Sequence, residues 1–253
     1  MAAPRPNPAF LLTMPLSKEA VTPLARGAEA PSGRDHARRS WTAVVALALI
    51  ALLAFAALGE AVVERETSRV DLAVRGWVHA NQSSFLVACS QALSRFGSVT
   101  PLIVVASAGA LYLLYRRRFM VTLPVLVAPA LGVLAYVTLK DVFERARPSA
   151  LATAIEGGTY SFPSAHATSS SAICCTLAYV FWREHLVNDT TALLFGLFVP
   201  LLVGLSRIYL DVHWTTDVLG GWSAGVLVAA LSAALYNGIR HLQARRQSTG
   251  EGK

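Results

Sequence analysis

The chain has 253 residues, of which 54% are hydrophobic and only 15% are charged. A soluble domain carries about 25% charged residues and a disordered chain lacks long apolar runs, so the composition excludes both classes. The three cysteines are too few for a disulfide framework, and the net charge of +7 comes from basic residues beside apolar runs, which indicates orientation in a membrane rather than binding to nucleic acid.

Residues 1–40 contain no sustained apolar run, and we expect them to be a mobile cytoplasmic tail. Six apolar runs follow, each approaching the roughly 20 residues that a spanning helix needs. They cover residues 41–63, 99–115, 120–139, 165–182, 191–205 and 218–236. In hydrocarbon only helices and closed barrels pair all backbone groups, and these runs lack the alternation of barrel strands. The sequence therefore predicts an all-α bundle of six transmembrane helices over residues 41–240, with a cytoplasmic C-terminal tail at 241–253.

The segment between the first two runs is a loop of about 35 residues that contains one further helical pattern. Phe85, Cys89, Ala92 and Phe96 recur at helical spacing. Two interpretations are open: a helix lying in the membrane interface, or the start of a tilted second span.

The basic residues set the orientation of the spans. Clusters such as Arg116 to Arg118 and the arginines of both terminal segments fall on one side if the N-terminus is cytoplasmic. We therefore expect both termini on the cytoplasmic side of the membrane. The compact six-span chain, with short loops and more Arg than Lys, suggests a bacterial plasma (inner) membrane. The joined ends of the third and fourth runs and of the fifth and sixth runs then lie together on the outer side.

Polar residues concentrate at these joined ends. They are Lys140, Arg147, Ser164, His166, Arg207, His213 and Asp217. Three cations at a membrane edge favour an anionic ligand such as a phosphate, and the backbone N–H groups of residues 164–166 at a helix start would add donors.

His213 and Asp217 are four residues apart, which places them on one helical face. A carboxylate that fixes one ring nitrogen leaves the other nitrogen to attack phosphorus, and His166 would protonate the leaving oxygen and later activate water. The cations would stabilise the charge of the transition state without a metal.

Ordinary structural explanations compete with this one. Lys140 and Arg147, taken alone, could be ordinary cations whose side chains extend to the interface. The His213–Asp217 pair could be a helix start or half of a metal site. Arg145 and Glu144 fit no motif and are expected to be ordinary interfacial residues. His79, His185 and His241 are expected to be solvated, and Ser169, Ser170 and Ser171 to allow close helix packing.

Three motifs carry a resemblance to a known family. Lys140-x6-Arg147-Pro148, Pro163-Ser164-Ala165-His166 and Ser206-Arg207-x5-His213-x3-Asp217 resemble the three-part signature of type-2 phosphatidic acid phosphatases, over about residues 60–240. The resemblance implies a phosphohistidine at His213 held by Asp217, His166 as acid and base, phosphate binding by Lys140, Arg147, Ser164, Ala165 and Arg207, and no metal or other cofactor. The family usually has Gly where this chain has Ala165, and Ala is costly there only if the backbone needs a positive φ.

The resemblance implies a membrane phosphatase that hydrolyses a lipid phosphate or diphosphate, in contact with membrane lipids and without nucleic acid. We expect undecaprenyl diphosphate as the substrate first, and phosphatidylglycerophosphate or phosphatidate next. Two other functions are open: non-hydrolytic phospholipid binding or transport, which would not need both histidines, and phosphotransfer to an acceptor other than water.

Overall fold

The computed structural model describes residues 33–156 and 158–250, and in this part of the chain it contains helices, loops and one isolated bridge between Ala146 and Tyr160. Because the described ranges contain no strand, the prediction of an all-α protein is confirmed. Nearly all of the predicted N-terminal tail lies outside the described residues. The arrangement below is that of the compact unit that begins at Arg38.

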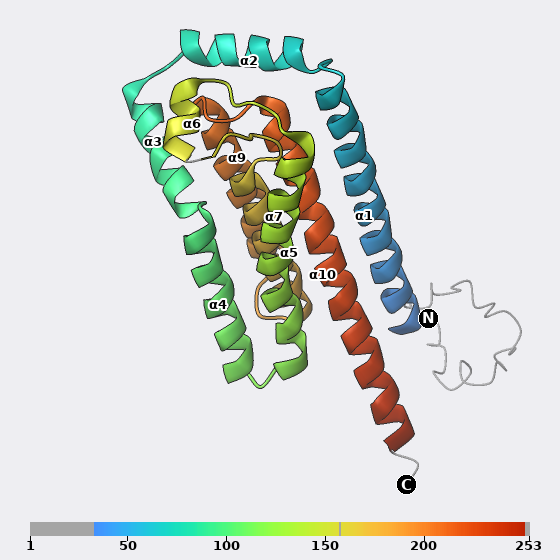
Figure 1. Cartoon of the computed structure of the whole chain (residues 1–253). Helices are drawn as coiled ribbons and strands as arrows, with labels where there is room; N and C mark the ends of the chain where they lie inside the picture. The colour runs from blue at the N-terminus through green and yellow to red at the C-terminus, as the bar shows by residue number, and fades with distance from the viewer. Residues whose placement is uncertain (1–32, 157, 251–253) are drawn as a thin grey trace, which may run out of the picture. The chain divides into compact units, whose positions relative to one another are not determined.

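The helices follow one another with short connections, apart from the loops that lead into and out of α6 (Figure 1). They are α1 (Gly33–Val63), α2 (Ser68–Ala80), α3 (Ser84–Phe96), α4 (Val99–Tyr115), α5 (Phe119–Phe143), α6 (Ala150–Glu156), α7 (Ala165–Arg183), α8 (Asp189–Leu193), the π-helical segment η2 (Leu194–Phe198), α9 (Val199–Tyr209) and α10 (Thr215–Gly250). The last helix continues through residues 241–250, where the sequence suggested a tail.

Four helical stretches are long and apolar enough to cross a membrane. They are Trp41–Val63, Phe119–Phe143, Asp189–Tyr209 and Thr215–Ser248. The pair α3 and α4 passes the same test together, with a bend of 51° between its members. The structure therefore supports a multi-pass membrane protein, while length and composition alone do not establish the predicted count of six.

The helix α7, which was predicted as a span, is missing from this set because its first half consists of small polar residues. It packs against α10, α5, α9, η2 and α4, and Ser169, Ser170 and Ser171 are all buried. A helix enclosed by protein on all sides needs less hydrophobicity than one that faces lipid. The predicted role of the three serines in close packing is in agreement with this position.

The helices α7 and α10 pack closely against each other through glycines. A Cβ on Gly221 would lie 2.8 Å from the Cβ of Ala167, and one on Gly225 would lie 2.5 Å from the carbonyl oxygen of Thr168. Only glycine allows this approach of the two backbones. The contact fixes the first turn of α7, which carries His166, against the second and third turns of α10, directly after the turn that carries Asp217.

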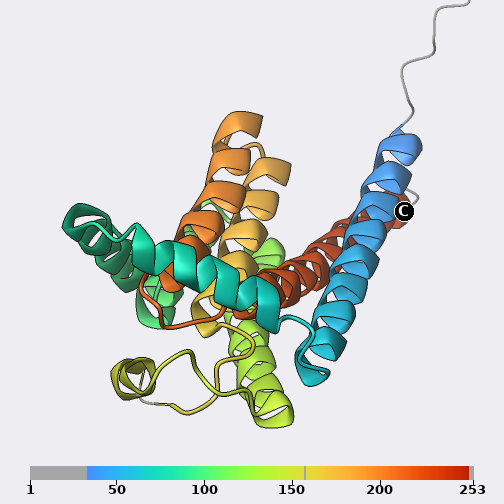
Figure 2. The same cartoon turned by 90° about the horizontal axis from the view of Figure 1, so that it is seen from above.

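The segment between α1 and α4 corrects the sequence analysis, because it forms two helices rather than one. The unpredicted helix α2 crosses one end of the bundle, as the view from above shows (Figure 2). The predicted helical pattern corresponds to α3, on which Phe85 and Phe96 are exposed. Its location in the membrane interface stays a prediction.

Candidate active site

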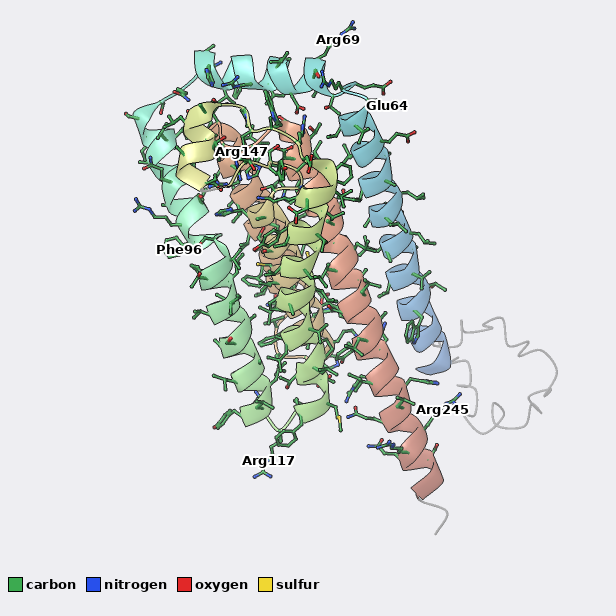
Figure 3. All side chains as sticks on the ribbon, viewed as in Figure 1. Glu64, Arg69, Phe96, Arg117, Arg147 and Arg245 are labelled. Carbon is green, nitrogen blue, oxygen red and sulfur yellow. The ribbon has the colours of Figure 1, made fainter. Side chains whose placement is uncertain are left out.

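The residues singled out from the sequence gather at one end of the bundle. Lys140 lies in the last turn of α5, Arg207 in the last turn of α9, and His213 just before α10 begins. Figure 3 shows Arg147 at this end, whereas Arg117 and Arg245 lie at the opposite end. The structure thus brings together residues that are as far apart in the sequence as Lys140 and Asp217.

The imidazole of His213 is buried between an acceptor and a donor. Its Nδ1 lies 3.3 Å from Oδ2 of Asp217, and its Nε2 lies 3.4 Å from a guanidinium nitrogen of Arg147. A carboxylate only accepts and a guanidinium only donates, so this network places the proton on Nδ1 and directs the lone pair of Nε2 toward Arg147. Burial lowers the pKa of His213 below 6.5, although the bond to Asp217 opposes that shift. The ring is therefore neutral at neutral pH.

Arg147 is held rigidly by the backbone. Its Nε donates to the Gly158 carbonyl at 2.7 Å, and Nη1 donates to the Val212 carbonyl at 3.0 Å. These bonds aim one edge of the guanidinium at Nε2 of His213. An anion beside that nitrogen would meet a cation that is already oriented.

Arg207 is also buried, and it is occupied by residues that the sequence analysis missed. Its guanidinium donates to the hydroxyl of Ser94 on α3 and to the carboxylate of Glu156 at the end of α6. Burial alone would raise the pKa of Glu156, but the charge of Arg207 and its hydrogen bond outweigh that effect and lower the pKa. Glu156 is therefore an anion at neutral pH, in the position where a phosphate would compete for Arg207.

Several buried polar atoms of the site have no hydrogen-bond partner among the described residues. They are Oγ of Ser164, Nδ1 of His166 and Nε of Arg207. Buried polar groups are nearly always paired, so these unpaired ones are available to hydrogen-bond a ligand. A cleft of about 600 Å³ reaches His166, Arg207 and Glu156, and Arg95 of α3 also lines it.

Two details of the predicted phosphate site change. The backbone N–H of Ser164 donates to the Asp217 carbonyl at 3.0 Å, whereas its hydroxyl has no partner among the described residues and is the donor left for phosphate. Ala165 is the first residue of α7 and is absent from the described non-glycine residues with positive φ, so Ala causes no backbone strain here. Lys140 lies within electrostatic range of Arg147, Glu156 and Arg207.

Arg145 is not the ordinary interfacial residue that the sequence suggested. Its guanidinium donates at 2.6 Å to Oδ1 of Asp217 and at 2.6 Å to Oδ2 of Asp71 on α2. Glu144, by contrast, is exposed as expected. His79 is half exposed, but it contacts Asp211 and is not simply solvated.

A sequence signal for α2 existed. Asp71, Arg75 and His79 follow one another at intervals of four residues, which places three polar side chains on one helical face. For the alternative that His213 and Asp217 are half of a metal site, the structure offers no additional ligand among the residues that it describes. The described ranges contain no group of three His, Cys, Asp or Glu residues that is placed to hold an ion.

Comparison with known proteins gives the family. The model of the PAP2 superfamily matches residues 121–240. Phosphatidylglycerophosphatase B of Bacillus subtilis is 34% identical over 157 residues, which are 60% of this chain and 68% of that protein. The chain belongs to the PAP2 superfamily. It is an enzyme of the phosphatase class, as these relatives are named.

Two further relatives extend the PAP2 comparison. Decaprenylphosphoryl-5-phosphoribose phosphatase of Mycolicibacterium smegmatis is 38% identical over 52% of this chain and 69% of its own length. The crystal structure of a transmembrane PAP2 type phosphatidylglycerolphosphate phosphatase from Bacillus subtilis matches with a TM-score of 0.63 at 27% identity, covering 74% of this chain and 94% of that one. The PAP2 model begins at residue 121, so α2 lies outside the matched family region.

Proposed function

We propose that this PAP2 enzyme hydrolyses a lipid phosphate or diphosphate through a phosphohistidine at His213. The observation that carries the proposal is the position of the His213 ring, with Nδ1 at Asp217 and Nε2 at Arg147. A phosphate held by Arg147 would lie next to the Nε2 lone pair, which is the nitrogen that can attack phosphorus.

In the first step Nε2 of His213 donates its electron pair to phosphorus, and the bond from phosphorus to the leaving oxygen breaks. Protonated His166 gives its proton to that oxygen, which leaves as the lipid alcohol or the lipid phosphate. Asp217 stabilises the positive charge that grows on the His213 ring. The equatorial oxygens are held by Lys140, Arg147, Arg207 and the Ser164 hydroxyl. The phosphate replaces Glu156 as the partner of Arg207.

In the second step water attacks the phosphohistidine. His166, now neutral, takes one proton from the water as its oxygen bonds to phosphorus. The bond between phosphorus and Nε2 breaks and its electron pair returns to His213. Inorganic phosphate leaves, and both histidines regain their starting states.

The residues 41–240 form the phosphatase domain in this proposal, with α4 and α7 as the second and fourth of six crossings. The 51° bend before α4 and the exposed aromatic side chains of α3 support α3 as a helix at the outer interface. In this proposal both termini are cytoplasmic and the site is on the outer face of the plasma membrane. The position of Arg117 and Arg245 at the end opposite Arg147 (Figure 3) supports this orientation through the positive-inside rule.

This orientation is testable with a thiol reagent that does not cross membranes. With Cys89 replaced by Ser, Ser149→Cys should be labelled on intact cells, and Arg117→Cys only after the cells are permeabilised. The reverse pattern would place the site in the cytoplasm.

The cleft favours a lipid that carries two phosphates. Arg95 lines the cleft beside Arg207 and His166, and it supplies a charge beyond the three cations that hold the reacting phosphate. The relatives are named for a glycerolipid and for a polyprenyl lipid, so we consider substrates with either kind of tail. We place undecaprenyl diphosphate first, phosphatidylglycerophosphate second and phosphatidate third.

Measuring turnover of the three lipids side by side in detergent determines the order of substrate preference. Arg95→Gln should lower turnover of the two-phosphate lipids several-fold more than turnover of phosphatidate. Equal losses would remove the argument for a second phosphate.

The mechanism is tested by His213→Ala in the purified protein. This variant should fold and lose phosphate release, whereas His241→Ala, a change at an exposed histidine of α10, should keep it. Near-normal turnover by His213→Ala would contradict the histidine nucleophile. Tight lipid binding by a wild-type protein that releases no phosphate would favour a binding protein instead.

A further inference from the structure

One face of α2 forms hydrogen bonds and ion pairs with the segment that carries His213. Arg75 donates two hydrogen bonds to the carboxylate of Asp211, at 2.7 and 2.9 Å, and Nε2 of His79 lies 3.1 Å from the same carboxylate. Asp71 accepts the backbone N–H of Thr216 at 3.0 Å and its hydroxyl at 2.8 Å. The helix thus binds this segment on both sides of His213.

Arg145 links this face of α2 to Asp217. Each of its terminal nitrogens lies 2.6 Å from one carboxylate, Asp217 on one side and Asp71 on the other. The side chains of both aspartates are at most 1% exposed. Such short bonds between buried charges hold all three groups in one arrangement.

The two oxygens of Asp217 have different partners. Oδ1 accepts Arg145, while Oδ2 accepts the backbone N–H of Trp214 at 3.0 Å and faces Nδ1 of His213. The guanidinium of Arg145 also lies 5.7 Å from the centre of the Trp214 ring. Arg145 therefore determines which oxygen of Asp217 points at the histidine.

In the group of Asp71, Arg145 and Asp217, the cation offsets only one of the two anions. Arg145 is one cation between two buried anions, so the charge of Asp71 offsets the effect of Arg145 on Asp217. Without Asp71, the cation would act on Asp217 alone and oppose the positive charge that develops on His213. Without Arg145, two buried carboxylates would favour that charge but would lose their orientation.

We propose that Arg145 and Asp71 are a positioning pair for the His213–Asp217 dyad, and that α2 is part of the active site although it lies outside the matched PAP2 region. The proposal rests on the proposed roles of His213 and Asp217. Neither Arg145 nor Asp71 lines the cleft that reaches His166 and Arg207, so both act through Asp217.

The proposal predicts opposite effects of the two partners on the pH profile of turnover. Asp71→Asn leaves an extra positive charge near His213 and should move the acid limb to lower pH, whereas Arg145→Gln removes a positive charge and should move it to higher pH, each by roughly 0.5–1 unit. Both should lower kcat roughly 10–100-fold, the range for groups that orient a functional histidine, with KM changed less than about threefold.

Other charged groups around His213 stay the same in these variants. They are Asp217, Arg147, Arg207, Glu156 and His166, with Lys140 next to them. A difference between variants therefore reports the Arg145–Asp71 pair alone.

A double variant and a neutral variant separate charge from orientation. Asp71→Asn with Arg145→Gln has the net charge of the wild type, so its acid limb should return to within about 0.2 unit of the wild-type position. Thr216→Val removes the hydroxyl that Arg145 and Asp71 share, and it should lower kcat without moving the limb. Thr216→Val also keeps the proposal testable if a charge variant fails to fold.

The matched control is Glu184→Gln, which removes a buried ion pair with Arg118 at the other end of the bundle. It should leave the acid limb and kcat of folded protein unchanged. Limbs that do not move, or that move in the same direction in both single variants, would overturn the proposal while loss of turnover in His213→Ala still supports the mechanism. Full turnover in His213→Ala would instead overturn the mechanism itself.

Discussion

The two ends of the bundle each bury a carboxylate, and they differ in what surrounds it. At the end opposite the site, Glu184 follows α7 and accepts Arg118 at 2.6 Å and the Tyr236 hydroxyl at 2.6 Å. Its side chain is completely buried, and Arg240 lies 3.6 Å away. At the site end, Asp217 is equally buried and also accepts an arginine, but its second oxygen faces a histidine.

The comparison shows that a buried carboxylate with an arginine is not by itself a sign of chemistry. Glu184 joins α7, α10 and the loop before α5, and the partners of its carboxylate are groups that stay protonated at neutral pH. Asp217 faces an imidazole whose other nitrogen faces Arg147. The nearby cleft contains unpaired polar atoms. The histidine and the unpaired hydrogen-bonding groups distinguish the active-site end of the bundle from the other end.

The largest difference between the two ends should come from the histidines that flank α7. His166 lies in its first turn and His185 shortly after its end. His166→Asn should lower phosphate release roughly 10²–10⁴-fold, because a positioned acid and base contributes about that much. His185→Asn is the matched control, since Asn tolerates its positive φ of 55°, and it should keep wild-type turnover. Similar losses in both variants would contradict the assignment of acid and base to one end.

An intermediate effect should come from removing the structural carboxylate. Glu184→Gln should lower the free energy of unfolding by about 1–3 kcal/mol, because it weakens buried charge-assisted hydrogen bonds, while turnover per folded molecule stays unchanged. Thermal unfolding and turnover in the same detergent measure both quantities. A loss of turnover at a temperature where the variant is folded would mean that the two ends are coupled.

The smallest effect should come from the ion pairs of Asp211 with α2. Burial would raise the pKa of Asp211, but Arg75 and His79 outweigh it and lower the pKa below 3.8. A lowered pKa stabilises the folded state above the unfolded value and loses that contribution as the pH falls through the folded value. Asp211→Asn, at a φ of 56° that Asn tolerates, should therefore cost less than about 1 kcal/mol near neutral pH. The gap between the unfolding temperatures of variant and wild type should close in acid, and a gap that widens in acid would contradict this sign.

The sequence predicted the apolar spans and the gathering of the motif residues, because both depend on local composition and on the order of the helices. It did not predict that neighbouring helices enclose α7, since such enclosure is not visible in a local window. It failed for Arg145 and Glu156, whose partners lie 74 and 51 residues away in the chain. Such pairs depend on tertiary packing, and the four-residue spacing along α2 was the one local sign of them.

The account depends most on the nucleophile, and trapping the phosphoenzyme tests it most directly. Wild-type enzyme mixed with lipid carrying ³²P in the terminal phosphate and quenched in alkali should carry acid-labile label on the peptide that contains His213. The label should be absent from His213→Ala and present in His241→Ala. Label on another residue, or continued phosphate release without any labelled intermediate and with full activity of His213→Ala, would contradict it.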